Sequence, residues 1–405
     1  MVEEPEQVEV VTGPRAAFRL LRQRDFGPYF VGNAVSSSGT WFQNLAAALL
    51  VYRLTHSALL LGVLNFAQFA AIIVLAPWTG AAADRFDRRK LLLVTQFGAT
   101  TLTALLAGLA FAGRANVPVV IAFSLLLGVG SAFSAPAQQA YVTSLVGPRD
   151  LRSALALNSM TFNLARAIGP ALAALVVDSL GIPAAFALNS GSYLVLAAAV
   201  AWSRPRQHRR AERGTVKLMD SIRLVRSNGR LLALLVVVAA IGFASDPINT
   251  LAPAFAHAFG HRDVVGGYLI GFFGGGAVLA AFALAGREFS RRHLIVTLCL
   301  TAAGVAGFSV APWLIVAAPL LVLGGVGYLA TNTTATARLQ LEVEDHERGR
   351  IMALWSIAFL GLRPFASLAD GAIAAATSVR VAGVVLVLPA LAAAGLLVVR
   401  ERRGR

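Results

Sequence analysis

Across 405 residues, only 14% of the side chains are charged while 57% are hydrophobic, and the mean hydropathy is +0.70. A soluble protein of this length would carry roughly a quarter charged residues, so this composition excludes an ordinary soluble enzyme and indicates a polytopic membrane protein. The net charge of +15 would suggest nucleic-acid binding in a soluble chain, but the distribution of the basic residues excludes that interpretation.

Twelve apolar segments follow one another along the chain, and each is long enough to cross a bilayer. A membrane span needs about 20 mostly apolar residues. Because no water is available inside the hydrocarbon to bind backbone N–H and C=O groups, each segment is expected to be a helix. The expected spans are 29–52, 59–79, 91–112, 118–140, 154–177, 184–203, 231–256, 264–286, 294–311, 313–337, 351–375 and 379–399.

The basic residues lie almost entirely on alternate connections between the spans. With the N-terminus inside, 29 of the 35 Lys and Arg fall on the N-terminal arm, the even-numbered loops and the C-terminal tail. The positive-inside rule therefore predicts that both termini are cytoplasmic. Anionic lipid head groups are a sufficient reason for the basic loops, so we expect no nucleic-acid partner. The remaining Arg lie in outer loops (Arg53, Arg114, Arg262, Arg380) or within spans (Arg166, Arg363).

A polar stretch after the sixth span divides the chain into two halves. Residues 204–230 carry nine Lys or Arg and contain no long apolar run. The expected organisation is a cytoplasmic arm (1–28), an N-terminal six-helix half (29–203), a cytoplasmic linker (204–230), a C-terminal six-helix half (231–399) and a cytoplasmic tail (400–405).

The two halves share a repeat that supports this division. At a shift of 197 residues Gly128 matches Gly325 and Arg166 matches Arg363, with further identities between them. Arg is rare within spans, so two Arg at equivalent positions argue for structural repeats, as in many transporters. The expected fold class is an all-α membrane protein with twelve transmembrane helices in two six-helix, pseudo-symmetric halves.

Two motifs resemble those of a known superfamily. GAAADRFDRRK (80–90), between spans 2 and 3, is similar to the loop signature of the major facilitator superfamily, namely Gly, three residues, Asp-Arg and a basic cluster. ARAIGPALAA (165–174) resembles the exporter motif of that superfamily in span 5 and retains Gly169 and Pro170. The resemblance implies the major facilitator fold and transport by alternating access.

Further stretches narrow the resemblance to a group within the superfamily. Residues 36–62 and ERGRIMALWS (347–356) are similar to the secretion-effector, enterobactin-exporter-like group of drug and natural-product exporters. Span 4 (118–140) departs from the family pattern, because it carries no charge where the family usually has an Arg linked to proton coupling.

The loop signature is interpreted as a conformational latch. The resemblance implies that Asp84, at the cytoplasmic surface, faces the N-terminus of span 11, whose positive dipole end stabilises a carboxylate. Such a contact would hold the two halves together on the inner side and release them when the transporter turns inward. The alternative is a topology signal alone, which explains the basic residues but not the Gly or the Asp. The latch residues are Gly80, Asp84, Arg85, Arg88 and Arg89.

Three acids lie within spans or at their edges. Asp246 precedes Pro247, and a carboxylate beside a disrupted helix is a candidate proton or cation site. The alternative is an Asp that caps the helix or pairs with an Arg. Asp370 either pairs with Arg363, seven residues earlier, or reaches outer water, and we expect Asp178 to be solvated.

The two repeat-related Arg are the remaining coupling candidates. An ionised group within the bilayer normally faces the interior of the bundle. Arg166 and Arg363 therefore either contact an anionic or polar part of the substrate or a coupling carboxylate, or else serve a structural role by bonding neighbouring carbonyls.

A polar stripe in span 1 predicts a substrate cavity. Asn33, Ser37, Thr40 and Asn44 are spaced so that they share one face of a helix. Polar side chains also bind membrane helices to one another, so helix packing is the alternative. The candidate cavity residues are Asn33, Ser37, Thr40, Asn44, Gln68, Gln138, Asn163 and Asn332.

These features predict a secondary active exporter of a small amphipathic drug, natural product or siderophore, driven by proton antiport in a bacterial cytoplasmic (inner) membrane. The alternatives are an importer of the same fold, acting as symporter or facilitator, and a membrane receptor or enzyme without transport. No Walker-type loop, HExxH or CxxC motif is present, and His257 and His261 lack a nearby acid or thiol in register. We therefore expect no enzyme activity, cofactor or metal, and a functional monomer whose partners are lipid, a small molecule and protons.

Overall fold

The computed structural model describes residues 14–147, 149–205, 218–284, 290–344 and 347–403. Every regular element in these ranges is helical. Eleven helical stretches in the described residues are long and apolar enough to cross a membrane. The long helix α2 (Phe26–Thr55) is not among them, because the polar stripe of the first span lowers its hydropathy. Counting α2 by its length and its place in the bundle gives twelve spans.

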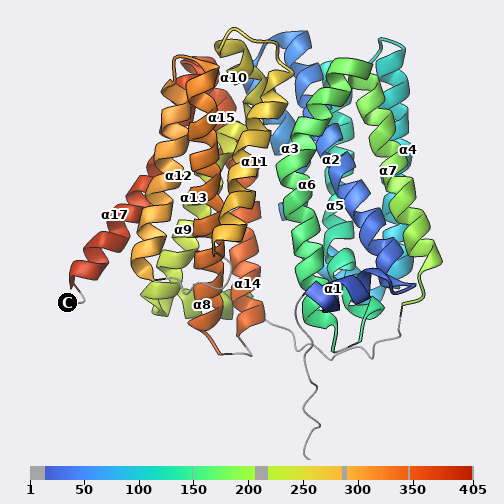
Figure 1. Cartoon of the computed structure of the whole chain (residues 1–405), viewed down its shortest axis with the longest axis horizontal. Coiled ribbons are helices and arrows are strands. Elements are labelled where there is room, and N and C mark those ends of the chain that lie inside the picture. Colours follow the sequence, from blue (N-terminus) through green and yellow to red (C-terminus); the bar gives the residue numbers. More distant parts are fainter. Residues whose placement is uncertain (1–13, 148, 206–217, 285–289, 345–346, 404–405) are drawn as a thin grey trace, which may run out of the picture.

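The N-terminal half consists of one surface helix and six long ones (Figure 1). Its helices are α1 (Pro14–Leu21), α2 (Phe26–Thr55), α3 (Ala58–Arg85), α4 (Arg88–Phe111), α5 (Val117–Leu145), α6 (Leu151–Leu180) and α7 (Ile182–Trp202).

The C-terminal half has the same six-span plan, but three of its spans are interrupted. Its elements are α8 (Leu218–Ser227), α9 (Gly229–Thr250), α10 (Ala252–Ala258), α11 (Val265–Leu284), α12 (Arg291–Val310), α13 (Leu314–Leu341), α14 (Arg348–Ser356), the π-helix η1 (Ile357–Gly361), α15 (Arg363–Ala376), α16 (Val379–Val385) and α17 (Leu388–Arg403). Helix α8 lies within the expected linker, and residues 206–217 of that linker lie outside the described residues.

The interruption in span 7 differs from the expected one. The helix continues through Pro247, with Leu251 N–H donating to the Pro247 carbonyl, and it ends at Thr250. A new helix then begins with Pro253 in its first turn, where a missing N–H costs nothing. Spans 11 and 12, each expected as one helix, are likewise divided, and span 11 contains a π-helical turn directly before Arg363.

Side chains at the starts of the helices explain why several spans begin where they do. Ser57 accepts a hydrogen bond from Leu60 N–H at the start of α3, and Asn116 accepts one from Val119 N–H at the start of α5. Asp87 accepts one from Lys90 N–H, at 2.9 Å. Asp87, which lies within the loop signature, therefore caps α4.

The two halves lie side by side (Figure 1). Helix α3 packs on α15, and α6 packs on α11, so each contact joins the two halves. A Cβ atom at Gly371 of α15 would lie 2.9 Å from the Ala58 carbonyl oxygen, which shows how closely these backbones approach. We call the end of the bundle that carries α1, α8 and the C-terminus the terminal face, and the opposite end, which carries α10, the far face.

Large apolar side chains cover the outside of the bundle. Phe282 is 79% exposed and Ile315 82% exposed, and Trp78, Phe97 and Phe111 are also exposed. A soluble monomer rarely exposes apolar surface on this scale, so these side chains are suited to lipid. Cys299 is exposed as well.

Candidate functional site

A cavity of about 340 Å³ lies between the two halves and is lined mainly by the N-terminal half. This volume falls within the range of small-molecule sites, roughly 300–1,000 Å³. More than half of its lining residues carry a side chain that can form hydrogen bonds. The polar residues are Asn33, Ser36, Ser37, Thr40, Asn44, Asn65, Gln68, Gln96, Ser131, Ser134, Gln138, Tyr193, Asn249 and Arg363; the apolar wall includes Trp41, Phe69, Phe162 and Leu360.

The stripe on α2 faces this cavity because its residues recur at helical spacing. Asn33 Nδ2 donates to Asn158 Oδ1 of α6 at 3.0 Å, and Gln68 Nε2 of α3 donates to Asn44 Oδ1 at 2.9 Å. The same side chains therefore bind neighbouring helices and line the cavity, so the two expected roles are combined. Of the expected lining set, the structure brings together Asn33, Ser37, Thr40, Asn44, Gln68 and Gln138.

Two expected cavity residues lie elsewhere. Asn163 is exposed on α6, and its amide donates to the Ser159 carbonyl at 2.8 Å. Phe162, one residue earlier, lines the cavity, because successive helical positions face directions about 100° apart. Asn332 of α13 does not line the cavity, and its buried Oδ1 has no hydrogen-bond partner among the described residues.

Three of the four coupling candidates meet at one end of the cavity. Arg363 lines the cavity, and its Nε lies 3.8 Å from Asp246 Oδ1 of α9. Asp246 is only 2% exposed, and its other oxygen accepts a hydrogen bond from the Thr250 hydroxyl at 2.8 Å. Asp246 thus has an Arg beside it, and Asp370, which is fully buried, neither pairs with Arg363 nor reaches outer water.

Asp370 faces Asp246 from α15. It is fully buried, and no N–H or hydroxyl of the described residues donates to either of its oxygens. The two buried carboxyl groups act on each other electrostatically. Because two neighbouring carboxylates repel each other when both are charged, a proton on one of the two is favoured.

The two repeat-related Arg both stack on an aromatic ring of the opposite half. The Arg166 guanidinium of α6 lies 4.7 Å from the Tyr328 ring centroid of α13, and that of Arg363 lies 4.7 Å from the Phe69 ring centroid of α3. Cation–π contacts of this kind are worth about 0.5–2 kcal/mol. Arg166 acts electrostatically on both Arg363 and Asp246 but does not line the cavity.

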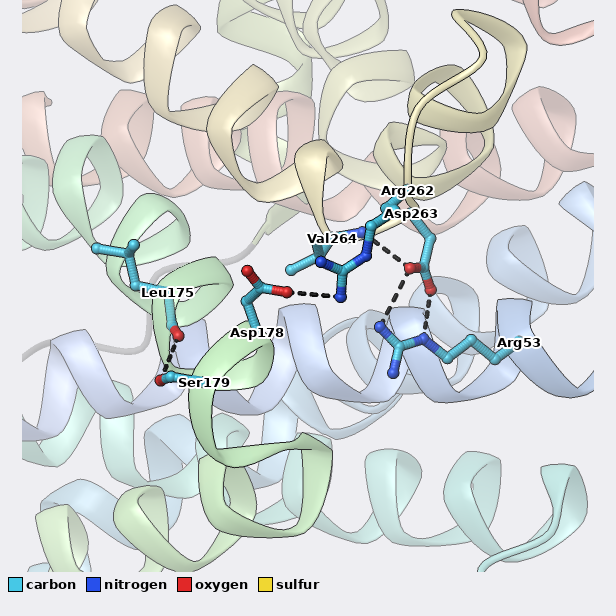
Figure 2. Close-up of polar contacts among 7 residues, drawn as sticks. All are labelled: Arg53, Leu175, Asp178, Ser179, Arg262, Asp263 and Val264. Atoms are coloured by element: carbon cyan, nitrogen blue, oxygen red, sulfur yellow. Dashed lines mark hydrogen bonds and ion pairs between the residues drawn. The ribbon is translucent and has the colours of Figure 1, made fainter.

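Ion pairs join the two halves at the far face (Figure 2). Arg53 of α2 binds both carboxylate oxygens of Asp263, at 2.6 and 3.1 Å. Arg262, the residue before Asp263, pairs with Asp178 of α6 at 2.6 Å. Asp178, expected to be solvated, is therefore engaged. We call these four residues the far-face clamp. Arg262 and Asp263, which are adjacent in the C-terminal half, each form an ion pair with a residue of the N-terminal half.

The described part of the expected latch is bound within the N-terminal half. Arg88 donates to the Ala140 carbonyl near the end of α5 at 3.2 Å. Arg89 donates to the Val200 carbonyl at 3.2 Å and also to the Ala201 carbonyl at the end of α7. Helix C-termini carry partial negative charge, which suits both Arg. Gly80, Asp84 and Arg85 belong to α3, but their side chains lie outside the described part of the chain.

The Gly-Pro pair of α6 lies at close helix contacts. A Cβ atom at Gly169 would lie 2.8 Å from the Trp41 Cβ of α2. The Pro170 carbonyl oxygen faces Gly267 of α11, where an added Cβ would lie 2.6 Å away. The pair therefore sits where α6 meets both its own half and the opposite one.

Several residues of the site were missed from the sequence. Thr250 follows Asp246 by one helical turn, and this spacing was a readable signal for the hydrogen bond. The Arg53–Asp263 pair could have been suspected from the scarcity of charge in the loops at the far face. Nothing in the sequence points to Phe69 or Tyr328 as stacking partners, because those contacts depend on how the halves dock.

Comparison with known proteins adds a family and several relatives. Residues 15–403 match the transmembrane secretion effector family of the major facilitator superfamily. The staphyloferrin A transporter of Staphylococcus aureus is 29% identical over 168 residues, which span 41% of this chain and 42% of the relative, so less than half of its length is matched. Macrolide efflux protein A of Streptococcus pyogenes is 23% identical over 301 residues, 69% of this chain and 71% of the relative.

Solved transporter structures share the fold at low sequence identity. A bacterial homologue of the human lysosomal transporter Spinster, in an inward-facing and unoccupied conformation, superposes with a TM-score of 0.72 at 15% identity, covering 96% of this chain and 98% of that one. A bacterial homologue of the iron transporter ferroportin, in an inward-facing state, gives a TM-score of 0.67 at 16% identity, covering 96% and 99%. The expected twelve-helix, two-half architecture is confirmed.

Proposed function

Since this chain belongs to the transmembrane secretion effectors, a family of major facilitator superfamily transporters, we propose that it exports a small amphipathic molecule from the bacterial cytoplasm by alternating access in exchange for protons. The cargo class we propose is a drug, natural product or siderophore. A macrolide efflux protein and a staphyloferrin A transporter among the relatives support this range. The Gly169-Pro170 pair, which resembles an exporter motif, supports the direction.

The topology we propose places the terminal face in the cytoplasm. The distribution of Lys and Arg supports it, because 29 of 35 lie on the connections and ends assigned to that side. The far-face clamp then closes the outer side of the molecule, and the cavity belongs to a state that receives cargo from inside. Rocking of one half against the other would open the far face and release the cargo.

The opposite state of the transport cycle would be closed at the terminal face. The latch that we propose for that state consists of Gly80, Asp84, Arg85, Arg88 and Arg89. In the present state Arg88 and Arg89 bind carbonyls of their own half, which is compatible with a released latch. Two ion pairs between the halves lie at the far face. Far-face clamp and latch would thus alternate.

Proton coupling in this proposal is supported by the proximity of Asp246 and Asp370. Asp370 is fully buried, with no donor among the described residues to either oxygen, and acts electrostatically on Asp246, so repulsion between the two carboxylates favours a proton on one of them. Arg363 connects this pair to the cavity, because it lines the cavity and lies 3.8 Å from Asp246. Binding or release of cargo at Arg363 therefore changes the electrostatic environment of the two acids.

Accumulation of dyes and antibiotics in cells tests the proposal. Cells that express the protein are compared with empty-vector cells, with and without a protonophore, over a panel of compounds. We expect lower accumulation of at least one compound, abolished by the protonophore and by Asp246→Asn at equal expression. Asp25→Asn is the matched control, since an Asn at this terminal-face position retains the oxygen that accepts from Arg204 N–H. Accumulation that the protonophore leaves unchanged would contradict proton coupling.

Import by the same fold is the second candidate, and one observation favours it. Arg363 is the charged side chain that lines the cavity, and the described lining residues include no acid. A cationic cargo and a proton therefore have no acid among these residues to which each could bind in turn. Uptake into inside-out and right-side-out vesicles distinguishes the two directions. Uptake confined to inside-out vesicles with an acidic lumen, from which protons leave as cargo enters, supports export. Uptake confined to right-side-out vesicles supports import.

A further inference from the structure

Arg363 is the charged side chain that the described residues contribute to the cavity wall, and its charge bears on the cargo. Arg363 carries a formal positive charge, and no Asp or Glu is present among the described lining residues. We propose that the cavity binds an anion, through a carboxylate or a comparable oxyanion, at the Arg363 guanidinium. This inference rests on the proposed transport function and names the charge class of its substrate.

The Arg363 guanidinium has donors free for such a ligand. A guanidinium carries five N–H donors in a planar fork. The Asp246 oxygen at 3.8 Å lies beyond hydrogen-bonding distance, and no other described residue accepts a hydrogen bond from Arg363. The Phe69 ring covers one face of the guanidinium, whereas the side chain keeps 15% of its surface exposed. The edge that carries the donors is therefore open to a planar oxyanion from the cavity.

The cluster around Arg363 also carries an excess of positive charge. Arg363 in the cavity wall and Arg166 behind it both act electrostatically on Asp246, so two cations lie near one pair of buried acids. A proton on one of the two neighbouring acids, which relieves their mutual repulsion, leaves them a single negative charge. A buried charge without a counter-ion is costly, and an anionic cargo supplies the missing one.

Asp246 is the internal counter-ion that the anion replaces. A bidentate carboxylate forms hydrogen bonds of about 2.7–2.9 Å with Arg, which is a stronger contact than the 3.8 Å pair. When the anion binds, Asp246 retains the Thr250 hydroxyl at 2.8 Å and its contact with Asp370. When the anion leaves, Asp246 again neutralises Arg363. The empty carrier therefore keeps one negative charge 3.8 Å from Arg363, while the second cation nearby, Arg166, has no acid of its own among the described residues.

The rest of the wall suits an anion that is rich in hydroxyl or carbonyl groups. Amides and hydroxyls of α2, α3 and α5 surround the space, and Trp41 and Phe162 supply apolar contact. These groups orient a polar ligand without charge of their own. A hydroxycarboxylate matches this combination better than a basic amphiphile, which would need an acid in the wall.

Binding to the purified protein tests the inference without any gradient. Citrate, as a hydroxycarboxylate probe, and tetraphenylphosphonium, as a cationic probe, are titrated by isothermal calorimetry into the full chain in nanodiscs. The variants are Arg363→Gln, Arg363→Lys, Asp246→Asn and, as the control outside the cavity, Arg114→Gln. Thermal unfolding of each variant verifies that it is folded. Because the assay measures binding and not transport, its result does not depend on the direction of transport or on proton coupling.

We expect citrate to bind the wild type and Arg114→Gln equally, and to bind Arg363→Gln at least about tenfold more weakly. Arg363→Lys should retain part of the affinity, since Lys keeps the charge but loses the planar fork. Asp246→Asn should bind citrate several-fold more tightly, because the internal competitor has been removed. Failure of citrate to bind the wild type, equal binding by Arg363→Gln, or weaker binding by Asp246→Asn would each overturn the inference. Asp246-dependent binding of tetraphenylphosphonium would point to a cation site instead.

Discussion

Arg53 of the N-terminal half binds both carboxylate oxygens of Asp263 in the C-terminal half, 210 residues further along the chain (Figure 2). The neighbouring residue, Arg262, forms the second pair with Asp178. Side chains in both pairs are partly exposed, so each pair is worth at most about 1 kcal/mol. A difference of that size is small for folding, but it changes the ratio of two conformations about fivefold.

Reversal of charge in the far-face clamp should therefore open the far face. In Asp263→Arg the new side chain faces Arg53 and Arg262, and repulsion replaces attraction. We expect a Cys placed in the cavity by Thr40→Cys, with Cys299→Ser as background, to react several-fold faster with a membrane-impermeant maleimide added outside the cell. The exchange variant Arg53→Asp/Asp263→Arg restores a pair of opposite charges, so its labelling should return toward that of the parent. Equal labelling of all three proteins would exclude the clamp as a determinant of the closed far face.

The contact between Arg363 and Asp246 should appear as a coupling free energy in protein stability. Removal of one partner leaves a buried charge, which costs about 3–5 kcal/mol. Asp246→Asn and Arg363→Gln should each lower the apparent melting temperature of the purified protein. The double variant should be more stable than the sum of the two losses allows, with a coupling of about 1–3 kcal/mol. Strictly additive losses would show that the 3.8 Å contact has no energetic consequence.

Hydropathy was enough to predict the bundle but not its interruptions. Span 4, expected at 118–140, is α5 (Val117–Leu145), because a long apolar run in lipid has no alternative to a helix. Span 7 remains apolar throughout residues 231–256, so its pattern contains no sign of the break after Thr250. Pro247 suggested a break four residues too early, because a Pro inside a helix removes one hydrogen bond without ending the helix when packing supports it.

Features of the site that depend on spacing within one helix could be predicted from the sequence. Contacts between residues far apart in the chain could not. The stripe from Asn33 to Asn44 faces the cavity because it lies on a single helix whose spacing is visible in the sequence. Asp246 and Arg363 are 117 residues apart, and the sequence left the partner of each open. The residue type alone predicts Asn163 in the cavity, whereas its position on α6 leaves it exposed.

The proposed latch has a direct test in Asp84→Asn. The amide retains hydrogen-bonding ability but loses the charge that a helix N-terminus favours by about 0.3–1 kcal/mol. We expect transport of a compound identified in the accumulation panel to fall several-fold at normal expression, because the state closed at the terminal face is weakened. The control is Asp87→Asn, three residues later, since Asn caps α4 as well as Asp does. Intact transport in the Asp84 variant would rule out the latch.

The close approach of α11 to α6 predicts that Gly267→Ala destabilises the state closed at the far face. The added Cβ would lie 2.6 Å from the Pro170 carbonyl oxygen and 2.7 Å from the Ala174 Cβ, and backbone on the opposite helix cannot move aside locally. The two halves must therefore separate at this level, and maleimide labelling of the Thr40→Cys reporter from outside should rise. Gly275→Ala, on the same helix, is the matched control, because nothing lies within 4 Å of its added Cβ. Equal labelling rates in both variants would show that closure of the far face does not depend on the contact between Gly267 and Pro170. The role inferred for Pro170 in joining the two halves would then also be excluded.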